Sequence, residues 1–164
     1  MSKMIQVRKK CLFMTVSTVL TVLFLLTTPV TAAETPQQQL ERAKNLSDEA
    51  TVKATLALET GDLALAQEAQ LLADEAAGII AAVTEIAADT GDTELAQAAL
   101  NASIGVGEAT NIIVGAAETI AATSTDPDTV AAASALATTA ATTAETTTTT
   151  QETAMATGAS MAAA

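Results

Sequence analysis

Histidine, tryptophan and tyrosine are absent from the sequence, and cysteine occurs only once, as Cys11. The two phenylalanines, Phe13 and Phe24, also lie near the N-terminus. Zinc, copper and haem sites need His, Cys or Met ligands in sufficient number, and nucleophilic catalysis needs a nucleophile beside a positioned base. The sequence therefore predicts a protein that is not an enzyme and that has no cofactor.

Basic residues are scarce and unevenly placed. Seven Lys and Arg stand against nineteen Asp and Glu, which gives a net charge of −12, and no basic residue follows Lys53. Nucleic acid and anionic lipid are bound largely through Lys and Arg contacts with phosphate, so neither is expected as a partner. Weakly bound divalent cations and a basic protein suit this charge, whereas self-association, the other expected interaction, would depend on the helix seams.

The longest uncharged apolar run, Leu12–Thr28, follows a basic N-terminal segment. Pro29–Ala33 then supplies the small residues that signal peptidase requires. We expect residues 1–32 to be a cleaved secretory signal peptide, cut after Ala32 or Ala33, and the protein to be periplasmic or secreted, without stable membrane insertion. The alternative is an uncleaved anchor, because about 17 apolar residues is the lower limit for a membrane span. Cleavage would leave three basic and nineteen acidic residues, a net charge of −16.

Four stretches have apolar residues at alternating intervals of three and four, the spacing of one helix face. We expect helices at about 36–59, 62–89, 92–122 and 127–144. The fold class is therefore predicted to be all-α, as an Ala-rich antiparallel bundle of three to four long helices. The seam residues that are expected to pack inside this bundle are Leu65, Leu72, Ile79, Val83, Ile86, Leu95, Val106, Ile113 and Ile120.

The ends of these helices carry residues typical of caps and turns. Thr-Gly-Asp occurs at 60–62 and again at 90–92, where glycine suits a helix end and aspartate a helix start. Residues 60–69 match 90–99 at seven of ten positions. Two helices that share a good turn explain this match, and the alternative is a helical-repeat protein, which needs at least three stacked units. The expected N-cap residues are Thr35, Asp62, Asp92 and Asp126.

Threonine dominates the sequence from Thr138 onward, with five in a row at 146–150. Runs of β-branched residues favour helix formation poorly. We therefore expect residues 145–164 to form a disordered, low-complexity Thr/Ala-rich tail.

Calcium is the one metal ion whose oxygen ligands the sequence offers, because carboxylates gather at two predicted turns. Asp89, Asp92 and Glu94 surround one turn, and Asp126 and Asp128 surround the other. The five would converge only if both turns lay at the same end of the bundle. Neither group has the spacing of an EF-hand loop, so helix capping is the favoured interpretation.

Three functions are compatible with these features. The first is an exported structural or interaction protein of the cell envelope or extracellular matrix, which self-associates through small-residue helix seams. The second is a periplasmic binding or carrier module for cations or a small ligand. The third is ice binding, because Ala/Thr-rich helices resemble type I antifreeze proteins, although those repeat threonine about every eleven residues and the threonines here are clustered.

Overall fold

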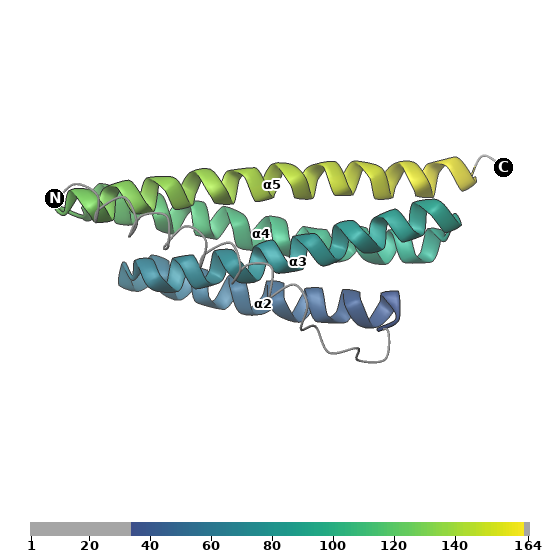
Figure 1. The fold of residues 1–164 in the computed structure, drawn as a ribbon, viewed down its shortest axis with the longest axis horizontal. Helices are drawn as coiled ribbons and strands as arrows, with labels where there is room; N and C mark the ends of the chain where they lie inside the picture. Colours follow the sequence, from purple (N-terminus) through teal and green to yellow (C-terminus); the bar gives the residue numbers. More distant parts are fainter. Residues whose placement is uncertain (1–33, 163–164) are drawn as a thin grey trace, which may run out of the picture. The chain divides into compact units, whose positions relative to one another are not determined.

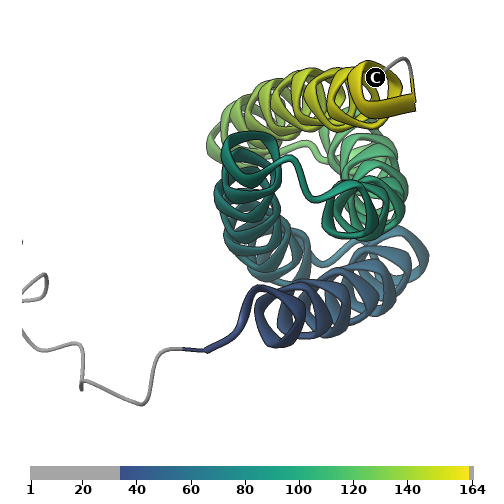
Figure 2. The same ribbon diagram turned by 90° about the vertical axis from the view of Figure 1, so that its right-hand side faces the viewer.

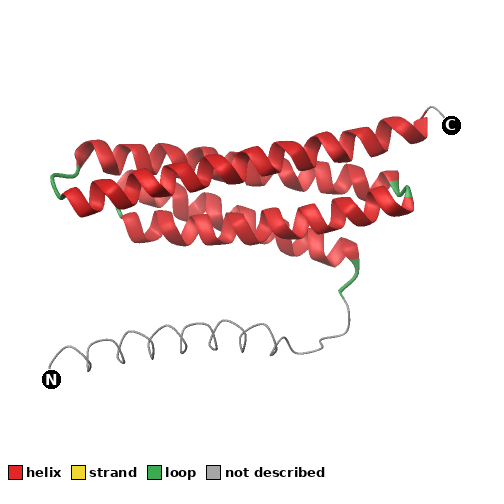
Figure 3. Ribbon diagram, turned by 45° about the horizontal axis from the view of Figure 1, so that its top comes forward, coloured by secondary structure: helices red, strands yellow, loops and turns green. Residues whose placement is uncertain are grey.

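The computed structural model describes residues 34–162 of the chain, and this part is built of α-helices joined by short turns. The helices are α2 (Pro36–Thr60), α3 (Leu63–Thr90), α4 (Thr93–Thr123) and α5 (Pro127–Ala162) (Figures 1 and 3). The all-α prediction is confirmed. The predicted signal peptide lies outside the described residues, and no described helix is both long enough and apolar enough to cross a membrane.

The residue before each helix caps it, because its side chain accepts a hydrogen bond from a backbone N–H of the first turn. Thr35 accepts from the Gln38 N–H, and Gln38 Oε1 accepts from the Thr35 N–H in return, which completes a capping box. Asp62, Asp92 and Asp126 accept in the same way from residues two or three positions later. The four expected cap residues therefore all lie at helix starts.

The turns after α2 and α3 depend on glycine. Gly61 and Gly91 have φ values of 71° and 68°, in the left-handed region that a Cβ atom disfavours. The Gly61 N–H donates to the Ala57 carbonyl and so ends α2 within two residues of the start of α3. The chain consequently reverses, and consecutive helices run antiparallel (Figures 1 and 3).

Each helix contacts its neighbour in sequence and also the next helix but one. Contacts join α2 with α3 and α4, and α5 with α3 and α4, while α3 and α4 also contact each other. Among the described helices, α2 and α5 do not meet. Figure 2, which looks along the helices, shows α2 and α5 on opposite sides with α3 and α4 between them. The two outer helices, α2 and α5, therefore each have a face that no other described helix covers.

Most buried apolar residues are alanines, and the larger buried side chains are few. Ile80, Val83, Val106 and Ile113 are among those that are almost completely withdrawn from solvent. Alanine contributes little hydrophobic free energy, because each methyl-sized group is worth about 0.8 kcal/mol. Its small size lets the helix backbones approach closely, so the few isoleucines and valines fill the space that the alanines leave.

Several of the buried residues of α3 lie one position later in the chain than the predicted seam residues. Ile86 was expected inside but is 39% exposed, so this prediction was wrong, while Leu65, Leu72 and Ile79 are only half-buried. Alanine lets the neighbouring helices come close, so the small residues occupy the centre of the contact and the larger ones its edges. The other predicted seam residues are buried, namely Val83, Leu95, Val106, Ile113 and Ile120. The residues at the centre of the α3 face are Ala66, Ala73, Ile80 and Ala87.

The prediction of a disordered tail after residue 144 was also wrong, because α5 continues to Ala162. Thr147 and Ala154 are buried along this second half of the helix. Most threonine hydroxyls here donate to the carbonyl four residues earlier, as Thr147 does to Thr143 at 2.8 Å. Tertiary packing therefore offsets the low helix propensity of threonine, a contribution that local sequence cannot report.

Candidate functional site

The five carboxylates considered as calcium ligands do not converge. Asp89, Asp92 and Glu94 lie around the turn between α3 and α4, whereas Asp126 and Asp128 lie beyond the other end of α4. Because α4 has 31 residues, the two turns are separated by about 46 Å at 1.5 Å per residue. Within residues 34–162, no group of three His, Cys, Asp or Glu side chains is placed to hold a metal ion.

Two of these aspartates instead cap helices. The Asp126 carboxylate accepts hydrogen bonds from the Thr129 hydroxyl at 2.6 Å and from the Thr129 N–H at 3.1 Å. These bonds stabilise the charged form and lower the pKa of Asp126. Asp92 accepts from the Leu95 N–H at 2.9 Å. Capping, the favoured interpretation of these residues, therefore accounts for their positions.

Three basic side chains lie on α2, and they differ in their surroundings. Arg42 pairs with Glu75 of α3, and Lys53 pairs with Glu68 of α3 at 2.9 Å. The hydrogen bond and charge of Glu68 raise the pKa of Lys53. Lys44 makes no ion pair with any described residue. It lies on the other side of α2, toward α4.

A polar cluster joins α3 to α5. Gln70 Nε2 donates to Asp74 Oδ1 at 2.7 Å and to Thr143 Oγ1 at 2.9 Å, and Thr143 Oγ1 donates to Asp74 Oδ1 at 2.6 Å. Gln70 is 3% exposed, and its Oε1 has no hydrogen-bond partner. Sequence reasoning missed this cluster, because Gln70 and Thr143 are 73 positions apart and nothing in the local pattern links them.

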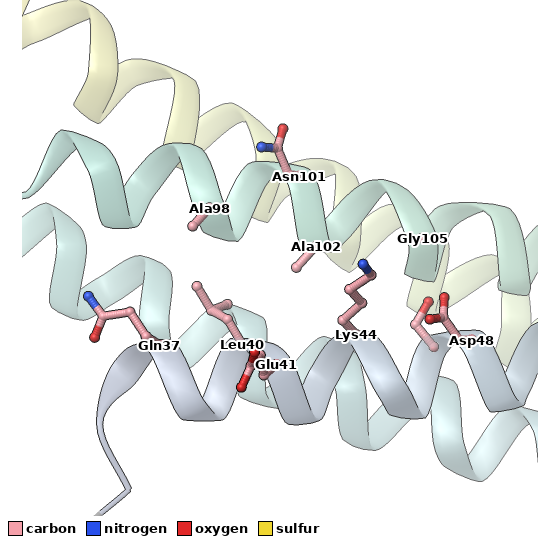
Figure 4. Close-up of a pocket in the computed structure, with 10 residues that line it drawn as sticks. Gln37, Leu40, Glu41, Lys44, Asp48, Ala98, Asn101, Ala102 and Gly105 are labelled. Atoms are coloured by element: carbon pink, nitrogen blue, oxygen red, sulfur yellow. The ribbon is translucent and has the colours of Figure 1, made fainter.

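A groove lies between the first half of α2 and the first half of α4. Its volume is about 430 Å³. Leu40 on one side and Ala98 and Ala102 on the other make an apolar floor (Figure 4). Glu41, Lys44 and Asp48 of α2 stand along its rim. None of these groove residues was named as a candidate site from the sequence, since charged and alanine residues at this spacing are typical of any solvated helix.

At one end of this groove, Gly105 of α4 lies against Ser47 of α2. Ser47 is 1% exposed, and its Oγ has no hydrogen-bond partner. A Cβ atom built on Gly105 would lie 2.8 Å from that Oγ, which is shorter than real Cβ contacts. Gly105 is therefore matched to Ser47, whereas a Cβ on Gly107 of the same helix would meet nothing within 4 Å.

This difference predicts opposite outcomes for two alanine substitutions. Gly107→Ala should raise the free energy of unfolding by about 1 kcal/mol, because alanine is the better helix former. Gly105→Ala should give no such gain, because its Cβ would displace the Ser47 hydroxyl. The gain should return when Gly105→Ala is combined with Ser47→Ala. Urea unfolding of the four variants checks this, and additive effects at 47 and 105 would contradict the close approach.

The outer face of α5 carries a continuous line of threonines. Thr138, Thr142, Thr146, Thr149 and Thr153 are exposed and follow one another at intervals of three or four residues. Each hydroxyl donates to the carbonyl four positions earlier, which fixes its orientation. The threonines that looked clustered in the sequence therefore form one stripe, about 22 Å long at 1.5 Å per residue.

Comparison with known proteins finds no matching family model, no matching curated protein and no matching solved structure. The described part is an all-α protein of four helices whose two outer helices do not meet. The features that bear on its function are the outer faces of α2 and α5, the groove between α2 and α4, and the negative net charge.

Proposed function

We propose that the protein is an exported, non-enzymatic structural or interaction protein that self-associates as an Ala-rich antiparallel helical bundle. The observation that carries this proposal is the open arrangement of the helices. Because α2 and α5 do not contact each other, each has an outer face that no other described helix covers. A second copy of the chain could cover such a face. Export is supported by the predicted signal peptide, which would direct the protein to the periplasm or the extracellular space.

The outer face of α2 carries the apolar side chains best suited to this contact. Val52 is 67% exposed and Leu56 is 44% exposed. Residues four apart lie next to each other on a helix surface, so these two form a single apolar spot. By contrast, α4 contacts all three other described helices, and its apolar surface is largely used within the chain. The outer helices, and not α4, are therefore the proposed interface.

The chemical character of the chain supports a structural role over a catalytic one. The sequence from Glu34 onward contains no histidine, cysteine or aromatic residue, and its charged groups are mostly solvated carboxylates. A strongly acidic surface keeps such a protein soluble and limits indiscriminate association. Self-association through a small apolar spot on an otherwise charged surface is then selective, because like charges oppose other alignments.

The test is the absolute mass of residues 33–164, measured by light scattering during size exclusion over a range of concentrations. These residues include the compact unit of residues 34–164. We expect a mass above that of the monomer. Val52→Lys combined with Leu56→Lys should return it to the monomer, because two lysines would have to be buried at the contact.

The control is Leu71→Lys, which alters a leucine on α3 that is 70% exposed, about as much as Val52. Its mass should equal that of the unsubstituted protein. A monomer at every concentration would contradict self-association. An oligomer that the paired α2 substitution leaves intact would place the interface elsewhere.

Ice binding is a second candidate, and the threonine stripe of α5 favours it. Pairs such as Thr138 and Thr149, and Thr142 and Thr153, are eleven positions apart on the same exposed stripe. Fixed hydroxyl and methyl groups at regular intervals suit an ordered water lattice. The expected result is thermal hysteresis that Thr142→Lys and Thr149→Lys abolish. A protein solution without hysteresis at millimolar concentration would end this candidate.

A further inference from the structure

We propose that the groove between α2 and α4 binds a small zwitterion with an apolar body, of the chemical class of the apolar α-amino acids. This is a binding function in addition to self-association, and it rests on other residues. The groove has a volume of about 430 Å³, which lies in the range of small-molecule sites. Such sites are mostly apolar and carry a few polar groups that fix the orientation of the ligand.

The rim of the groove presents two opposite charges that are not used within the chain. Lys44 and Asp48 lie four positions apart, so both are on the same side of α2. Neither forms an ion pair or a hydrogen bond with any described residue. The order Lys then Asp is the less favourable one for pairing along a helix, which is consistent with their separation. Both charges therefore remain available to a ligand.

Figure 4 shows how these groups stand over the groove. The Lys44 side chain extends from α2 toward Ala102 of α4, and Asp48 lies toward the end marked by Gly105. Leu40 and Ala98 occupy the groove on the other side of Lys44. A ligand lying along the groove would thus meet a charged end and an apolar end in turn.

Ser47 is the independent observation that points to a ligand. Ser47 lines the groove at the charged end and is almost completely withdrawn from solvent, and its Oγ, which lies against Gly105, has no hydrogen-bond partner. A buried polar group without a partner costs about 1 to 3 kcal/mol. A ligand with both donor and acceptor atoms at this end would remove that cost, because a serine hydroxyl can donate and accept.

These features together select the ligand class. The carboxylate of an α-amino acid would bind the Lys44 ammonium, and its ammonium group would bind the Asp48 carboxylate. Its hydrocarbon side chain would lie on Leu40 and Ala98. A simple carboxylate would leave Asp48 without a partner and would be opposed by Glu41, while a simple amine would be opposed by Lys44. A neutral apolar molecule would use neither charge.

The experiment is isothermal titration of the purified full-length chain with L-leucine. The same protein is titrated with 4-methylpentanoate, which lacks the ammonium group, and with 3-methylbutylamine, which lacks the carboxylate. We expect leucine to bind saturably with one molecule per chain, and each analogue to bind at least tenfold more weakly. The absence of saturable leucine binding at millimolar concentration would overturn the proposal, as would equal binding of either analogue.

Substitutions locate the site. Lys44→Gln and Asp48→Asn should each weaken leucine binding at least tenfold, and Ala102→Leu should abolish it by filling the floor of the groove. The charge-matched controls on the same helix are Lys53→Gln and Glu49→Gln, which do not line the groove and should leave the affinity within twofold.

The control for Ala102→Leu is Ala122→Leu, which adds the same side chain at an exposed position of α4. Circular dichroism before each titration shows that a variant is folded. Leucine binding that survives both Lys44→Gln and Ala102→Leu would refute this site. Because the α2 interface residues Val52 and Leu56 do not line the groove, the result is independent of the self-association test.

Discussion

Replacing Ile113 with alanine should lower the free energy of unfolding by about 3 kcal/mol. Ile113 is 0% exposed, belongs to the cluster that joins α2, α3, α4 and α5, and is one of the few large buried side chains. Its neighbours are mostly alanines, which have no side-chain freedom with which to fill the space. The cavity would therefore persist, and the full cost of lost contacts would be expressed.

The matched control is Ile104→Ala, which makes the same chemical change on the same helix. Ile104 is 51% exposed, so its replacement should change the free energy of unfolding by less than about 0.5 kcal/mol. Urea unfolding followed by circular dichroism measures both, since residues 34–164 contain no aromatic side chain for fluorescence. Equal losses at the two positions would contradict the orientation of α4.

Removal of residues 145–164 should destabilise the protein by about 3 kcal/mol, equivalent to a fall of about 10 °C in Tm. The buried methyl groups of Thr147 and Ala154 would be lost, and the part of α4 that they cover would be exposed. Thr147 lines a groove between α4 and α5 together with Ile104 and Gly107. At about 0.8 kcal/mol for each methyl-sized group, these two methyl groups and a similar apolar area of α4 that they cover together account for the expected loss.

Two neighbouring threonines supply the control for this truncation. Thr147→Asp would bury a charge and should release the second half of α5, whereas Thr148→Asp places the same charge at an exposed position and should have little effect. Helix content from circular dichroism and thermal unfolding report both. An unchanged Tm after truncation would mean that residues 145–164 do not contribute to the fold.

The sequence by itself determined the all-α fold class and most of the helix ends. Thr35, Asp62, Asp92 and Asp126 each accept hydrogen bonds from residues two or three positions away, and Gly61 ends α2 through a local left-handed turn. These interactions involve only neighbouring residues, so their energies are specified by the local sequence. The intervals of three and four residues likewise indicated helix without reference to the rest of the chain.

Only the tertiary structure decided which face of each helix is buried. In α3 the buried centre runs through Ala66 and Ala73, and Ile86 lies outside. When alanines are spread around a helix, several faces have similar hydropathy, and the face that is buried depends on how closely the neighbouring backbones can approach it. The pattern of large residues alone therefore predicted a face that was rotated by one position.

The continuation of α5 and the composition of the groove were also decided by tertiary contacts. Threonine has a low intrinsic helix propensity, and the helix persists beyond residue 144 because Thr147 and Ala154 are buried against other helices. At the groove, Ser47 lies against Gly105, which is 58 positions later in the sequence. The two can lie this close because glycine has no side chain. Such contacts depend on how distant segments pack, and no local pattern in the sequence encodes them.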